Sequence, residues 1–166
     1  MDVVSDTILI IMREKRFLFL ELLIIVGVTA FLVSAFFVLE DPKGKFAGSR
    51  NDRRWTDVSL ILDAVSKYTE NNNGEIPSGI DESPVTLQII GSRSFGCGIK
   101  CKEINGEEAC LDLSGSLVDG YIKSIPFDPL SVSEDFTKYY INRLSDGRIE
   151  LGACEGEAGA RIMVVR

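Results

Sequence analysis

The sequence predicts an α+β protein in which a long N-terminal helix packs on a small C-terminal antiparallel β-sheet. One half of this helix is expected to span a membrane and the other half to be amphipathic. Three observations predict this fold class: an apolar run over residues 17–39, a helical pattern of apolar residues after it, and three strand-like segments that close the chain.

Residues 1–16 form a basic, leader-like segment ahead of the apolar run. Arg13, Lys15 and Arg16 lie directly against the run, as basic residues do in targeting segments. The run is too long for a secretory signal, and no small-residue cleavage site follows it. We therefore expect any cleavage to fall before Phe17, so that the apolar run is retained.

Residues 17–39 are expected to form a transmembrane helix. At about 1.5 Å rise per residue, the run is long enough to cross a hydrocarbon core of about 30 Å. It is apolar on every face, whereas a soluble core helix has a polar side. Its one acid is Glu21, near the start. Glu21 is either tolerated in the membrane interface or is the functional residue of the segment.

The domain beyond the span is expected to lie on the extracytoplasmic side. The count of basic residues opposes this orientation, because five follow the span closely and three precede it. Glu40 and Asp41 come directly after the span, however, and the cysteines beyond it indicate an oxidising compartment. The chain carries a net charge of −7, which argues against general nucleic-acid binding.

Residues 40–48 predict a kinked linker, because Pro42, Gly44 and Gly48 disfavour a continuous helix. A second helix is then expected from Ser49 or Asn51, within a head domain of residues 49–166. Its apolar stripe comprises Trp55, Val58, Ile61, Leu62, Val65 and Tyr68, whereas Asp57, Asp63, Lys67 and Glu70 are expected to point elsewhere.

The second helix is predicted to stop at the Asn73-Gly74 pair, which favours a left-handed cap. The following segment is mixed, with a possible short strand in "VTLQII" and a short helix in "CLDLSGSLVDGYI". At the end, "TKYYINRL" and "RIELGACE" read as strands joined around Asp146-Gly147, a hairpin signal, and "ARIMVVR" reads as a third strand. A sheet of these strands would cover the apolar stripe of the helix.

This order of elements resembles that of type IV pilins and the pseudopilins of type II secretion. The segment "FLFLELLIIVGVTAFLVSAFFVL" is similar to the leading hydrophobic segment of the family, with its phenylalanine first and its glutamate fifth. The "NNG-x-x-P" exit of the second helix and "YIKSIPFDP" before the closing strands are similar too. Arg16 stands where the family normally has glycine, and Val38 where many members have proline.

The resemblance implies roles for three residues. A prepilin peptidase would cut between Arg16 and Phe17, and the new terminus would be methylated. Glu21 would pair with the freed amine of Phe17 on a neighbouring subunit during assembly, since pairing removes most of the cost of burying either charge. If Arg16 prevents cutting, a basic side chain stays nearby and is an alternative partner for Glu21.

Cys97, Cys101, Cys110 and Cys154 all lie in the proposed extracytoplasmic domain and are expected to form two disulfides. Three pairings are possible from sequence. A zinc site and free thiols are the competing interpretations, but the "CGIKC" pair has no second close pair and the chain has no histidine. Asp128, Glu134 and Asp135 are weak candidates for a calcium site, and no other cofactor is expected.

The functional expectation is a structural one. Without histidine, neither a Ser-His nor a Cys-His nucleophile pair can be built, and no phosphate-binding glycine motif is present, so we do not expect an enzyme. The first hypothesis is a pilin-like subunit that polymerises with copies of itself and other pilins on a membrane assembly platform and ends in a cell-surface filament. Adhesion, twitching motility, DNA uptake and secretion are all compatible with it. The alternative is a non-polymerising, membrane-anchored binding module.

Overall fold

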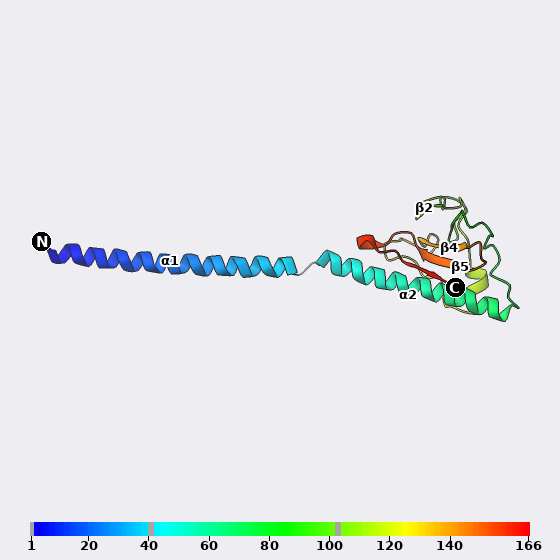
Figure 1. The fold of residues 1–166 in the computed structure, drawn as a ribbon, viewed down its shortest axis with the longest axis horizontal. Helices are drawn as coiled ribbons and strands as arrows, with labels where there is room; N and C mark the ends of the chain where they lie inside the picture. Colours follow the sequence, from blue (N-terminus) through cyan, green and yellow to red (C-terminus); the bar gives the residue numbers. More distant parts are fainter. Residues whose placement is uncertain (1, 40–41, 102–103) are drawn as a thin grey trace. The chain divides into compact units, whose positions relative to one another are not determined.

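The structure, a computed structural model, describes residues 2–39, 42–101 and 104–166, with side chains for 18–37, 44–99, 101 and 105–166. It separates into two compact units, Met1–Lys43 and Gly44–Arg166. The first unit contains one long helix, α1 (Asp2–Leu39). The second unit is the head, in which a helix packs on an antiparallel sheet, and this confirms the predicted α+β class (Figure 1).

The second helix, α2 (Pro42–Asn71), begins earlier than predicted. A start at Ser49 or Asn51 was wrong, because Pro42 occupies the first helical position, where its missing N–H costs nothing and its φ angle suits the helix. Gly44 and Gly48 lie within the helix, so the predicted linker is helical from Pro42 onward. Of that predicted linker, residues 40 and 41 lie outside the described residues.

The predicted stop after α2 is confirmed. Asn73 and Gly74 both have positive φ angles, of 56° and 91°. This left-handed turn lets the Gly74 N–H donate to the carbonyl of Thr69 at 2.9 Å, which satisfies one of the last free carbonyls of the helix.

The main sheet has four antiparallel strands in the order β1-β4-β5-β6. The predicted hairpin is formed by β4 (Tyr139–Arg143) and β5 (Ile149–Ala153), and Gly147 turns between them with a φ angle of 86°. The predicted third strand is β6 (Met163–Val165), paired with β5. The short strand β1 (Gln88–Ile89) comes from "VTLQII" and pairs with β4 on the other side.

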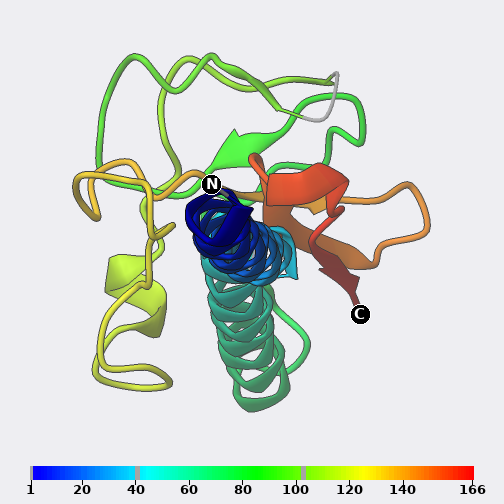
Figure 2. The same cartoon turned by 90° about the vertical axis from the view of Figure 1, so that its left-hand side faces the viewer.

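The segment between β1 and β4 carries little regular structure. It contains a small hairpin of β2 (Lys100–Cys101) and β3 (Ile104–Asn105), which the sequence did not predict, and the short helix α3 (Ser114–Leu117), which it did. A 3₁₀ turn, η1 (Glu157–Gly159), follows β5. Figure 2 looks along α2 and shows α3 and the β4–β5 hairpin on opposite sides of that helix.

The core of the head lies between α2, the sheet and the α3 region. Val58, Ile61 and Val65 of α2 are buried in one cluster with Ile141 and Leu151 of the sheet. The predicted stripe is therefore confirmed from Val58 onward.

Two helix positions differ from the prediction. Trp55 remains 41% exposed, whereas Arg54 is fully buried in its place, because positions 54, 58, 61, 62 and 65 share one helix face. Asp57 was expected to point away but is also buried, and its carboxylate accepts a hydrogen bond from the hydroxyl of Tyr139 at 2.8 Å.

Candidate functional site

The apolar surface of α1 is the first candidate site. The span Leu18–Phe37 is long and apolar enough to cross a membrane, and none of it is buried within the structure. Its large apolar side chains are each 52–72% exposed. An exposed apolar surface of this extent needs lipid or a protein partner to cover it. The described part of the chain thus has one candidate membrane-spanning helix, near the N-terminus.

Glu21 is the only charged residue in this span, and its side chain is exposed. It lies one turn from Leu18 and Ile25, so its nearest helical neighbours are apolar. Among the side chains that the structure describes, none forms an ion pair or hydrogen bond with the Glu21 carboxylate. A carboxylate on such a surface is costly once lipid or protein covers it, and a cation from a partner would offset most of this cost.

The hydroxyls of the span are satisfied within the helix itself. Thr29 donates to the carbonyl of Ile25 at 2.9 Å, and Ser34 donates to that of Ala30 at 2.8 Å. Neither residue therefore needs a partner in an apolar environment. This leaves Glu21 as the group in the described part of the span whose polarity the helix does not satisfy.

The predicted processing site falls within α1, and its side chains lie outside the described residues. The backbone of Arg16 and Phe17 is helical. Cleavage of the chain between these two residues stays a prediction.

The four cysteines pair as two disulfides, Cys97–Cys110 and Cys101–Cys154, with Cα atoms 5.3 Å and 5.0 Å apart. This confirms the prediction of two bridges and selects one of the three possible pairings. Cys101–Cys154 ties the irregular middle segment to the end of β5. With Leu87, Ile89 and Tyr140, the buried cysteines form a second small core cluster.

The three calcium candidates do not share one site. Asp128 is fully buried and both of its carboxylate oxygens accept hydrogen bonds from Arg54, whereas Glu134 and Asp135 line a cavity elsewhere in the head. No group of three acidic or cysteine side chains with metal-binding geometry occurs among the described residues. Calcium binding stays an untested prediction, with Asp128 already engaged by a cation.

An ionic cluster joins α2 to two loops; its members are the buried Arg54 and Asp128 and the partly exposed Arg50, Asn51 and Glu157. Arg54 forms ion pairs with Asp128 at 2.5 Å and with Glu157 at 2.8 Å. Arg50 also pairs with Glu157, and the Asn51 side chain bonds both the N–H and the carbonyl of Glu157. The cluster thus fastens η1 and the loop at Asp128 to the helix.

This cluster was not predicted, although the sequence carries one signal for it. Arg54 lies four residues before Val58 and therefore in phase with the apolar stripe. A charged residue in that phase predicts a buried ion pair, because an unpaired charge would be too costly there. The partners, 74 and 103 residues away in the chain, carry no local sequence signal.

Electrostatics within the cluster favour the ionised forms. Burial lowers the pKa of Arg54, but the hydrogen bonds to Asp128 and Glu157 raise it above its ordinary value overall. Hydrogen bonds from Arg50 and Arg54 lower the pKa of the Glu157 carboxyl from 4.5 to about 2. Arg54 and Glu157 are therefore both charged at neutral pH, and the cluster acts as a structural clamp.

The clamp predicts how the stability of the head depends on acid. A carboxyl whose pKa is lowered on folding stabilises the fold above its ordinary pKa of 4.5, and this stabilisation is lost as the pH falls toward about 2. The urea midpoint of Glu157→Gln should therefore fall less than that of the wild type between about pH 5 and pH 2. Glu75→Gln, an exposed acid outside the clamp, should follow the wild type. Parallel curves for wild type and Glu157→Gln would contradict the clamp.

In comparisons with known proteins, no family model, curated protein or solved structure matches this chain. What the chain does must therefore be inferred from the chemistry of its own residues. Those residues offer an exposed apolar span, Leu18–Phe37, that contains one acid, and a head held together by disulfides and ion pairs.

Proposed function

We propose that this chain is a structural subunit of a filament of the type IV pilus or pseudopilus kind. The observation that carries the proposal is Glu21, an acid without a partner among the described side chains, near the start of the exposed apolar span Leu18–Phe37. A simple membrane anchor does not require an acid in its span, whereas in a bundle of identical helices such an acid can select one axial register.

The assembly mechanism pairs opposite charges between subunits. Once the chain is cut before Phe17, the new amino terminus of one subunit neutralises Glu21 of its neighbour. In the apolar interior of the bundle either charge alone is costly, so only the register that pairs them is favourable. Repetition of that register gives a fixed axial step. If residues 1–16 are retained, Arg16 of the neighbour takes the place of the amine.

The head suits a mechanical role outside the cytoplasm. Two disulfides and the ionic clamp hold its loops on α2 and the sheet, and disulfides are typical of oxidising compartments. Before assembly the subunit would be a single-pass membrane protein with an extracytoplasmic head. Its partners would be copies of itself, other pilins, the membrane assembly platform and a prepilin peptidase.

The mechanism predicts that Glu21→Ala blocks incorporation into filaments without preventing membrane insertion. Removal of one partner from a buried ion pair typically costs about 3–5 kcal/mol, so incorporation should fall at least about tenfold. The measurement is the amount of subunit in sheared, sedimented surface filaments relative to the membrane fraction. Thr29→Ala is a matched control, since it removes a polar group that bonds only its own helix. Normal incorporation of Glu21→Ala would refute the pairing mechanism.

The second candidate function, a non-polymerising anchored binding module, is favoured by Arg16 at the position where a prepilin has glycine. N-terminal mass analysis of membrane-extracted protein separates the two functions. Loss of residues 1–16 together with recovery of filaments supports the subunit. An intact N-terminus with no filaments under any growth condition supports the anchor.

A further inference from the structure

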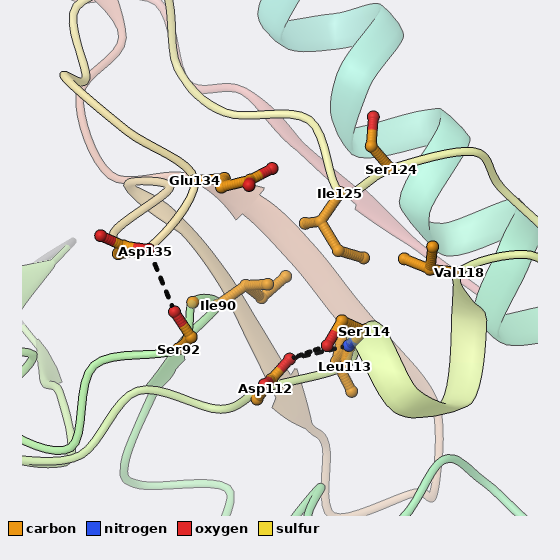
Figure 3. Close-up of a pocket in the computed structure, with 11 residues that line it drawn as sticks. Ile90, Ser92, Asp112, Leu113, Ser114, Val118, Ser124, Ile125, Glu134 and Asp135 are labelled. Atoms are coloured by element: carbon orange, nitrogen blue, oxygen red, sulfur yellow. Dashed lines mark hydrogen bonds between the residues drawn. The ribbon is translucent and has the colours of Figure 1, made fainter.

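A cavity of about 330 Å³ opens on the head, and the calcium candidates Glu134 and Asp135 are among its lining residues. Its apolar lining comes from Ile90 after β1, Leu113 and Val118 around α3, and Ile125 in the following loop. The side chains of Ile90, Val118 and Ile125 face the same space in Figure 3. A cavity of this size with an apolar lining accommodates a small organic group.

All charged residues among the described residues that line this cavity are acids: Asp112, Glu134 and Asp135. Asp112 and Glu134 lie on opposite sides of the apolar side chains, whereas Asp135 is turned toward Ser92, whose hydroxyl donates to it at 3.2 Å (Figure 3). Asp112 already accepts two hydrogen bonds from Ser114, both through Oδ1. Glu134 has no hydrogen-bonding or ionic partner among the described side chains.

The loop at Asp135 is held rigidly beside the cavity. Its carbonyl accepts the Ser92 N–H at 3.0 Å, and Gly91 lies so close to it that a Cβ atom at this position would collide with the carbonyl oxygen. Thr137 secures the same loop by donating to the carbonyl of Ile90 at 2.7 Å. The neighbouring carboxylate of Glu134 is therefore presented from a fixed backbone, which lowers the entropic cost of binding a ligand.

We propose that this cavity binds a small organic cation, a primary ammonium group on a short aliphatic stem. The ammonium group is held by Glu134, and the stem packs on Ile90, Val118 and Ile125 in the direction of Asp112. No basic side chain occurs among the described residues of the lining, which disfavours anions. A bare metal ion is disfavoured as well, because it would leave the apolar lining uncovered. This site is lined by head residues alone, so it does not depend on filament formation.

The test is a titration of the full chain in a neutral detergent, followed by the methyl NMR signals of Ile90, Val118 and Ile125. The probe is 1,5-diaminopentane, compared with 1,5-pentanediol, ammonium chloride and calcium chloride. Saturable shifts are expected for the diamine alone, with a Kd of about 1 mM for so small a ligand. Nα-acetyl-lysine N-methylamide identifies the source: tighter binding than the diamine indicates a lysine side chain of a protein, and weaker binding a free amine.

A matched pair of variants completes the test. Glu134→Gln should weaken diamine binding about fivefold, as expected for a partly exposed charge pair, while Glu75→Gln leaves it unchanged. Equal shifts with the diol, saturable shifts with calcium alone, or unchanged binding by Glu134→Gln would each overturn the proposal. The midpoint of thermal unfolding of Glu134→Gln should equal that of the wild type. A loss of binding in this variant is then not caused by a loss of fold.

Discussion

Arg54→Met is expected to lower the free energy of unfolding of the head by about 3–5 kcal/mol. The substitution keeps much of the side-chain volume but removes the charge that faces Asp128, and both of these side chains are fully buried. An ionised carboxylate would then remain buried without its cation, which is among the most costly defects in a protein interior. The only tryptophan, Trp55, lies next to this position, so its fluorescence reports urea unfolding of the full chain in detergent.

The neighbouring arginine supplies the control for this prediction. Arg53 is 57% exposed and reaches Asp57 at 3.7 Å, so Arg53→Met should cost less than about 1 kcal/mol. The double variant Arg54→Met with Asp128→Leu should recover part of the loss, because it removes the stranded carboxylate as well. Equal effects of the two single arginine substitutions would show that Arg54 is not the centre of a clamp.

Loss of the Cys101–Cys154 bridge is expected to lower the free energy of unfolding by about 4 kcal/mol. The bridge closes a loop with a sequence separation of 53, and the chain entropy that a cross-link removes from the unfolded state grows with loop length. The double variant Cys101→Ala and Cys154→Ala removes the bridge without leaving a free thiol. Urea unfolding of the full chain under non-reducing conditions measures the loss.

The second bridge provides an internal comparison. Cys97–Cys110 has a sequence separation of only 13, so its removal by two alanines should cost about 3 kcal/mol, roughly 1 kcal/mol less than the longer bridge. Peptide mapping without reduction tests the pairing itself. A Cys97–Cys101 or Cys110–Cys154 peptide would contradict the structure, and a larger loss for the shorter bridge would contradict the loop-length argument.

Local patterns in the sequence predicted most of the regular elements. The apolar run of α1, the stripe from Val58 to Val65, the Asn73-Gly74 stop and the Asp146-Gly147 hairpin each depend on residues that are close in the chain. Their periodicity and turn chemistry therefore suffice to identify them. The start of α2 was misplaced because Pro42 was interpreted as a helix breaker, although at the first helical position proline is favourable.

The pairing of distant residues was beyond local pattern. The short strand β1 was expected, but its place beside β4 was not, and nothing in the sequence around Arg54 identifies Asp128 or Glu157 as its partners. The same holds for the cysteines, whose number predicts two bridges but not which thiols meet. The cavity beside Glu134 likewise gathers its lining from five separate segments between Ile90 and Asp135.

Local patterns alone suffice to predict an apolar span with one acid, followed by an α+β head, because hydrophobic periodicity and turn residues act over a few neighbouring positions. Three features follow from the folded chain instead: the entry of Arg54 rather than Trp55 into the core, the pairing of the cysteines, and the position of the acid-rimmed cavity. These features depend on contacts between residues far apart in the chain, and the folding of α2 onto the sheet brings such residues together.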